Sequence, residues 1–98
     1  MKPQSESSGV AAGVAWYRSE QWARLLEVSL DRAELENTYD EWQSMATRRL
    51  EDLARAGVRV CKVDVDVDDL VAWCRSEGRP VDAAARAAFA AVKLRQSR

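Results

Sequence analysis

The chain has 98 residues with 15 basic and 16 acidic side chains, no histidine, and a formal net charge of −1. Its length predicts one domain, and the 47% apolar and 32% charged content is typical of a folded globular chain. Without histidine, Ser-His-Asp, Cys-His and ordinary zinc sites cannot be built within one chain, so we expect no catalytic, cofactor-binding or metal-binding residues.

The first residues predict a mobile arm, residues 1–12, followed by one compact domain, residues 13–98. The arm mixes serine, glutamine, glycine and proline without periodicity, and it has no apolar run typical of a signal peptide. No later window approaches the roughly 20 apolar residues of a membrane-spanning helix. We therefore expect a cytoplasmic protein that does not enter membranes, with its two cysteines reduced.

Residues 14–17 form a short apolar run that fits either a strand or the lead-in to a helix. From Ser19 to about Leu30, apolar positions recur with helical spacing and predict a helix with one buried stripe. Residues 31–37 lose this stripe and act as a connection. The stripe contains Trp22, Leu25, Leu26 and Ser29.

A second helix is predicted from Thr38, because Thr38 and Glu41 form the T-x-x-E pattern of a capping box. Gly57 stands where a helix commonly ends in a left-handed residue. The predicted buried face contains Tyr39, Trp42, Met45 or Ala46, Leu50 and Leu53.

Residues 58–65 follow this glycine and are rich in β-branched side chains, which predicts a strand. Val58 and Val60 share one face, whereas Val63 and Val65 share the other. The pair Cys61 and Lys62 therefore marks a change of facing, a bulge or an early end of the strand.

Two further helices follow, the first capped by Asp66 or Asp68 and ending at Gly78, the second capped by Asp82. Pro80 separates them. The first stripe contains Val67, Leu70, Val71 and Cys74, with Trp73 at its edge, and the second contains Val81, Ala85, Ala88, Phe89 and Val92.

These elements predict a mainly helical α+β fold, with about four helices and a small two-stranded sheet in the order β-α-α-β-α-α. If the strands pair in parallel, the intervening helices form the crossover that such a pair requires. A two-stranded sheet in so short a chain is marginal alone, and further burial in a homodimer, through a strand edge or the alanine-rich last helix, would stabilise it.

The acidic residues 64–69 have carboxylates at alternate positions, as at the start of a calcium loop. The match fails because Asp69 stands where the loop needs glycine and Arg75 where it needs glutamate. We interpret these acids as a strand end followed by helix caps and first-turn acids, and we expect no metal site.

The cysteines, Cys61 and Cys74, are predicted to pack as small apolar side chains. They have no C-x-x-C spacing and no histidine to activate them. An oxidisable dithiol is the alternative if the two residues meet in the fold.

Six aromatic residues lie on or beside the predicted elements, and we assign Trp22 and Trp42 to the core. Trp16, Tyr17 and Trp73 lie at element edges, so any of them that stays exposed is the predicted contact surface for a partner. They are the candidate site residues of this sequence.

Basic residues occur in the pair Arg48 and Arg49 and in the last helix, at Lys93, Arg95 and Arg98. A nucleic-acid accessory role requires one continuous basic face. The net charge and the lack of a recognition motif argue against that role.

Three short segments, at residues 14–18, 38–42 and 71–75, give the chain a resemblance to small bacterial proteins of about this length. The similarity extends over residues 14–94. It implies a bacterial, cytosolic setting and assigns no activity, cofactor or site.

The sequence therefore favours a non-enzymatic interaction or regulatory module that associates with itself or with another protein. The alternatives are a small-molecule-binding protein or minor enzyme using Asp, Glu, Arg and Tyr, and the nucleic-acid accessory protein. The enzyme alternative predicts a pocket holding a carboxyl of raised pKa beside Tyr or Arg.

Overall fold

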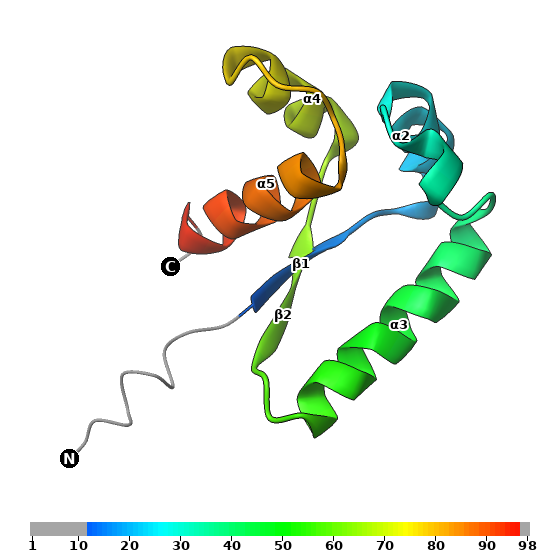
Figure 1. Ribbon diagram of the computed structural model, residues 1–98, viewed down its shortest axis with the longest axis vertical. Coiled ribbons are helices and arrows are strands. Elements are labelled where there is room, and N and C mark those ends of the chain that lie inside the picture. Colours follow the sequence, from blue (N-terminus) through cyan, green and yellow to red (C-terminus); the bar gives the residue numbers. More distant parts are fainter. Residues whose placement is uncertain (1–11, 97–98) are drawn as a thin grey trace.

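The structure is a computed structural model that describes residues 12–96 (Figure 1). The described residues form the predicted mainly helical α+β fold, in the predicted order. The predicted arm lies outside the described residues except for Ala12, which begins the first strand. The elements are β1 (Ala12–Trp16), the 3-10 turn η1 (Ser19–Gln21), α2 (Trp22–Val28), the 3-10 turn η2 (Arg32–Glu34), α3 (Tyr39–Arg55), β2 (Val60–Asp64), α4 (Val67–Ser76) and α5 (Ala83–Gln96).

The two strands pair in parallel, in an unbroken register from Ala12 opposite Val60 to Trp16 opposite Asp64. The apolar run near residue 14 is therefore a strand, but it starts before the predicted residues and ends before Tyr17. The unbroken register leaves no bulge at Cys61 and Lys62. Within β2, Val60 and Val63 point to opposite faces because they are an odd number of positions apart in a regular strand.

Helices α5 and α3 lie on opposite faces of this small sheet (Figure 1). Gly13 faces α5 so closely that an added Cβ would lie 3.2 Å from Cγ2 of Val63 and 3.3 Å from the carbonyl oxygen of Ala90. On the other face, the rings of Trp16 and Trp42 lie 5.0 Å apart. Successive residues of β1 thus alternate between the two helices.

The core beside α3 is aromatic. The rings of Trp22 and Trp42 stack at 5.4 Å, and Tyr17 lies 5.3 Å from Trp42. The hydroxyl of Tyr39 donates a 2.9 Å hydrogen bond to the carbonyl oxygen of Tyr17. The indole N–H of Trp22 is buried and has no hydrogen-bond acceptor among the described residues.

Helix α3 begins as predicted, with both hydrogen bonds of the capping box between Thr38 and Glu41. Its buried face is shorter than predicted. Trp42 and Ala46 are buried, but Leu50 and Leu53 are only half-buried, and Met45 is 36% exposed. The periodic pattern continues beyond the part of the helix that the core covers.

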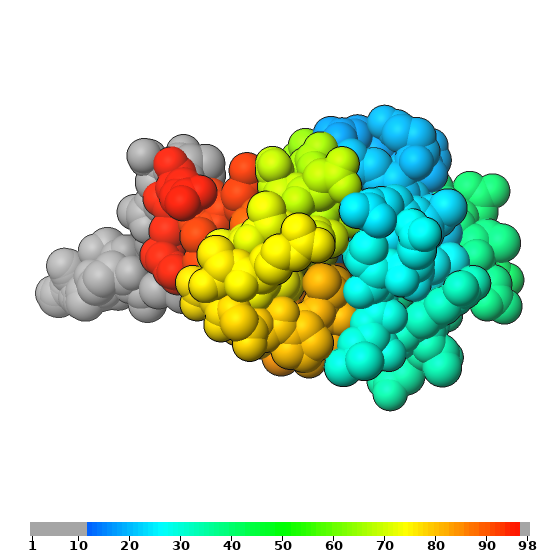
Figure 2. Space-filling model, turned by 90° about the horizontal axis from the view of Figure 1, so that it is seen from above, coloured from blue at the N-terminus to red at the C-terminus, as the bar shows by residue number. Residues whose placement is uncertain are grey.

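Helices α2 and α4 lie side by side, with the start of α5 visible between them (Figure 2). Asp66 caps α4 by accepting a hydrogen bond from the amide of Asp69, and Asp82 accepts one from the amide of Ala85. The predicted stripes supply buried residues from both α4 and α5. These are Val67, Leu70, Cys74, Ala85 and Phe89.

Candidate functional site

The candidate site is a groove of about 460 Å³ that lies along β1, between α3 and α5; we call it the β1 groove. The segment between α2 and α3 borders one end of it. Its lining residues are Gly13, Val14, Ala15 and Tyr17 from β1 and the residue after it, Asp31, Glu34, Leu35 and Glu36 from the connecting segment, Trp42, Met45, Ala46, Arg49 and Leu53 from α3, and Ala83, Arg86 and Ala87 from α5.

The floor of the groove is the open edge of β1. The described residues contain two strands, so β1 has a neighbour on one side. The amide of Ala12 donates to Arg59 and the carbonyl of Trp16 accepts from Val65, so the even-numbered residues use their backbone groups toward β2. Because these groups alternate along a strand, those of Gly13 and Ala15 point into the groove.

The α3 wall of the groove is apolar with one free charge. Met45 and Leu53 keep part of their side chains accessible there. The exposed Arg49 lies between them and forms no salt bridge with any residue of 12–96. This wall is the part of the predicted buried face that the fold leaves uncovered.

The opposite wall ends in a buried ion pair. Both terminal nitrogens of Arg86 donate to Asp31, at 2.9 Å and 2.6 Å, and one also donates to the hydroxyl of Ser29 at 3.2 Å. The side chains of Arg86 and Asp31 are only 10% and 17% exposed. The pair therefore fixes α5 to the segment that follows α2.

Burial and charge set the protonation states at this end. The hydrogen bonds from Arg86 lower the pKa of Asp31, although burial opposes this shift. Burial disfavours the charged form of Arg86, but the hydrogen bonds and charge of Asp31 outweigh it and raise the Arg86 pKa. Burial raises the pKa of Tyr17 to about 12. Near neutral pH, Asp31 and Arg86 are charged and Tyr17 is protonated.

These protonation states differ from those that the enzyme alternative predicts. A general acid would need a carboxyl of raised pKa in the groove, whereas the pKa of Asp31 is lowered. Asp31 is also occupied by both hydrogen bonds from Arg86. The arrangement is that of a structural ion pair.

Sequence reasoning missed this ion pair. Arg86 stands in an alanine-rich helix and Asp31 in a segment without periodicity, 55 residues away. The available signal was the charge of Arg86 next to the apolar stripe of α5, because a charged residue is rarely buried unless it is paired.

The three predicted contact residues lie in different places. Tyr17 is buried at 4% exposure, and it borders the β1 groove. Trp16 is half-buried, with the ammonium of Lys62 4.2 Å from its ring centre. Trp73 is half-buried against Phe89, with the guanidinium of Arg79 5.6 Å from its ring centre. The fold does not bring Trp73 to the groove.

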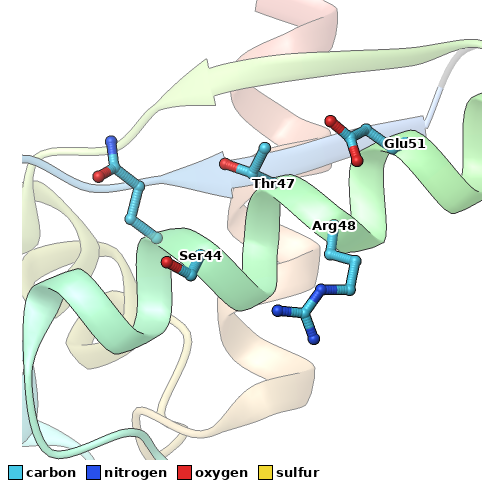
Figure 3. Close-up of a pocket in the computed structure, with 5 residues that line it drawn as sticks. Ser44, Thr47, Arg48 and Glu51 are labelled. Carbon is cyan, nitrogen blue, oxygen red and sulfur yellow. The ribbon is translucent and has the colours of Figure 1, made fainter.

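The outer face of α3 carries a shallow polar hollow of about 310 Å³ (Figure 3). Its residues come from successive turns of one helix, and Arg48 points away from Glu51. Arg48 borders this hollow, whereas Arg49 borders the β1 groove. Arg48 and Arg49 therefore lie on different surfaces of α3. Arg98 lies outside the described residues.

The cysteines and acids form no joint site in the described part of the chain. Cys74 is buried as predicted, and burial raises its pKa; the core prediction is wrong for Cys61, which is exposed. Cys74 lies on the apolar stripe of α4, which faces the core, whereas Cys61 lies in β2, four of whose five residues are not buried. Residues 12–96 contain no group of three Cys, Asp or Glu side chains that could hold a metal ion.

The acids of residues 64–69 instead meet basic and polar side chains of residues 18–24. Arg18 contacts Asp64 at 3.2 Å and Asp66 at 3.4 Å. Arg24 contacts Asp68 at 3.2 Å, which joins α2 to the first turn of α4. Asp64, Asp66 and Asp68 thus each have a basic partner, and Asp66 also caps α4.

Comparisons with protein-family models, with curated proteins and with solved structures found no match to this chain. Among residues 12–96, none of the helices has the length and apolar character needed to cross a membrane.

Proposed function

We propose that the protein is a small protein-interaction module and that the β1 groove is its contact surface. The observation that carries this proposal is the open edge of β1 at the floor of a groove with an apolar wall. An unpaired strand edge offers backbone donors and acceptors, and many protein partners bind by adding a strand to such an edge.

The half-covered face of α3 supports the same proposal. Met45 and Leu53 keep apolar surface accessible beside the strand edge. Backbone hydrogen bonds with neighbouring apolar contacts suit an extended polypeptide, which has both kinds of group. The partner in this proposal is either a second copy of the chain or another protein, in the bacterial, cytosolic setting that the resemblance implies. Tyr17 borders the groove but is buried, so it supports the groove from below.

Photo-crosslinking in cells that naturally express the protein tests the surface. A photoreactive phenylalanine analogue replaces Leu53 in the groove or, as a matched control on the same helix, Arg48 on the outer face. We expect the Leu53 position to crosslink to protein, either a second copy of the chain or another protein, and the Arg48 position to give no such product.

Equal crosslinking from the two positions, or none from either, would contradict the proposal. A small-molecule-binding role predicts no protein product from the groove. Circular dichroism of each purified variant verifies that the helices are retained.

A further inference from the structure

The open edge of β1 carries outward-facing backbone groups at alternate residues. Gly13 and Ala15 direct their amide and carbonyl groups into the β1 groove, with Val14 between them. In an antiparallel pair of β1 strands, Gly13 of one copy lies opposite Ala15 of the other, and Val14 lies opposite Val14. Each Gly13–Ala15 pair exchanges two backbone hydrogen bonds, as antiparallel strands do.

We propose that two copies of the chain join through this edge, giving a four-stranded sheet in the order β2-β1-β1-β2. This inference rests on the proposed interaction function and names its partner. The axis relating the copies runs through the Val14 pair, perpendicular to the sheet. Both α5 helices then lie on one face and both α3 helices on the other, because directly opposite residues of antiparallel strands share a face.

The side chains near the edge suit this arrangement. On the α5 face, the residues brought together are Gly13 and Ala15, and the groove side of α5 presents Ala83 and Ala87. Such small side chains allow two helices to approach closely above a new strand pair. On the α3 face, Val14 meets its own copy, and the exposed parts of Met45 and Leu53 become covered.

The charges in the groove are also complementary under this symmetry. Glu34 and Glu36 line the groove at the carboxyl end of β1, where Tyr39 of α3 contacts Tyr17. Arg49 lies about 10 Å further along α3 than Trp42, toward the amino end of β1. Antiparallel pairing brings opposite ends together, so Arg49 of each copy approaches Glu34 and Glu36 of the other. These three charges form no salt bridge within residues 12–96.

A second copy fits the edge better than the chain's own residues 1–11. That segment, MKPQSESSGVA, includes lysine, glutamate, glutamine and three serines. The groove offers an apolar wall, and β1 itself, AGVAW, is uncharged and has small residues at its centre. A two-stranded sheet is also marginal in water, and pairing doubles its strand number.

The oligomeric state of the full chain tests the inference directly. Sedimentation equilibrium at micromolar to millimolar concentration should give twice the chain mass of 11.0 kDa. Ala15→Pro removes an edge amide that the β1–β2 ladder does not use and places the ring in the edge, so it should weaken the dimer about tenfold or more. Ser44→Ala, on the outer face of α3, should leave the dissociation constant unchanged.

Exchanging the charges of Arg49 and Glu36 tests the interface without changing any residue of β1. Arg49→Glu should weaken the dimer, and the double variant with Glu36→Arg should restore it toward the original dissociation constant. Rescue by the double variant requires that the two positions meet across the interface. Failure of the rescue would contradict the proposed register.

Amide exchange identifies the occupant of the edge. Protection of the Gly13 and Ala15 amides should rise with chain concentration. Rapid exchange of these amides in a dimer would show that the interface lies elsewhere. Protection that does not depend on concentration would show that another part of the same chain covers the edge. Either result overturns the inference. A monomer whose Leu53 position still crosslinks to a different protein overturns it too, and leaves the proposed function standing.

Discussion

At the scale of single residues, the guanidinium of Arg86 links α5 to the segment that follows α2. It bonds Ser29 and both carboxylate oxygens of Asp31, and it lies almost completely inside the protein. Removing one partner of such a pair costs more than removing both, because it leaves a charge without compensation away from water.

Asp31→Ala is therefore expected to lower the free energy of unfolding by about 3 kcal/mol. Urea denaturation at pH 7 measures this loss. The double variant Asp31→Leu with Arg86→Met should recover part of it, since no charge is left unpaired. The matched control is Asp52→Ala, which removes an exposed pair with Arg55 and should have little effect. Equal effects of Asp31→Ala and the control would contradict a structural role for the buried pair.

Tyr17 makes the free energy of unfolding depend on pH in the alkaline range. Its pKa is 10.0 ordinarily and about 12 in the folded chain, because burial disfavours the phenolate. The folded chain therefore holds the Tyr17 proton more tightly than the unfolded chain does. This contribution to stability is complete below pH 10 and is lost as the pH rises from 10 to about 12. The contribution is about 3 kcal/mol.

Tyr17→Phe should remove that part of the pH dependence. We expect the free energy of unfolding of the variant to fall less steeply between pH 10 and pH 12 than that of the original chain, when both are measured by urea denaturation. Identical slopes would show that Tyr17 ionises as readily in the folded state as in the unfolded state.

At the scale of elements, the starts of α3, α4 and α5 were the most predictable features, whereas the helix predicted from Ser19 begins as a 3-10 turn and becomes α-helical at Trp22. Thr38 and Asp82 cap their helices through side-chain contacts with residues three positions away, and Asp66 does the same. These contacts are local, so the sequence contains both partners of each one. The strand ends were less predictable: β1 starts at Ala12 and stops before Tyr17, because pairing with β2 decides where a strand ends.

Thr38→Ala tests the cap of α3. Loss of the hydrogen bond from the Glu41 amide should lower the free energy of unfolding by about 1 kcal/mol. Thr47→Ala, in the exposed middle of the same helix, should be neutral or slightly stabilising because alanine favours helix. Urea denaturation of both variants separates the effect of the cap from the general preference of helices for alanine over threonine. Equal losses would show that the cap contributes nothing specific.

At the scale of the whole molecule, the sheet has an open edge and α3 has a partly covered face, on the same side of β1. Pairing of two copies would make folding depend on chain concentration, since association stabilises only the folded state. A hundredfold increase in concentration should add about 1.4 kcal/mol per chain, half of the roughly 2.7 kcal/mol gained per dimer. The midpoint of thermal unfolding should therefore rise by several degrees.

Calorimetry over this concentration range measures the shift. Ala15→Pro should reduce the dependence on concentration, whereas Ser44→Ala should retain it. A midpoint that does not move with concentration in the original chain would contradict the paired assembly.

The amino-acid sequence by itself determined the order of the elements, the starts of α3, α4 and α5 and most of the core. Periodic stripes such as Leu70 and Cys74, and caps such as Thr38 with Glu41, depend on neighbours within a few positions, so they can be found without the fold. The tertiary structure alone decided that Arg86 meets Asp31, that Leu53 stays half-covered and that Gly13 and Ala15 border a groove. Each of these depends on how far apart α3, α5 and β1 come to lie, and no local pattern specifies the spacing of elements that are distant in the chain.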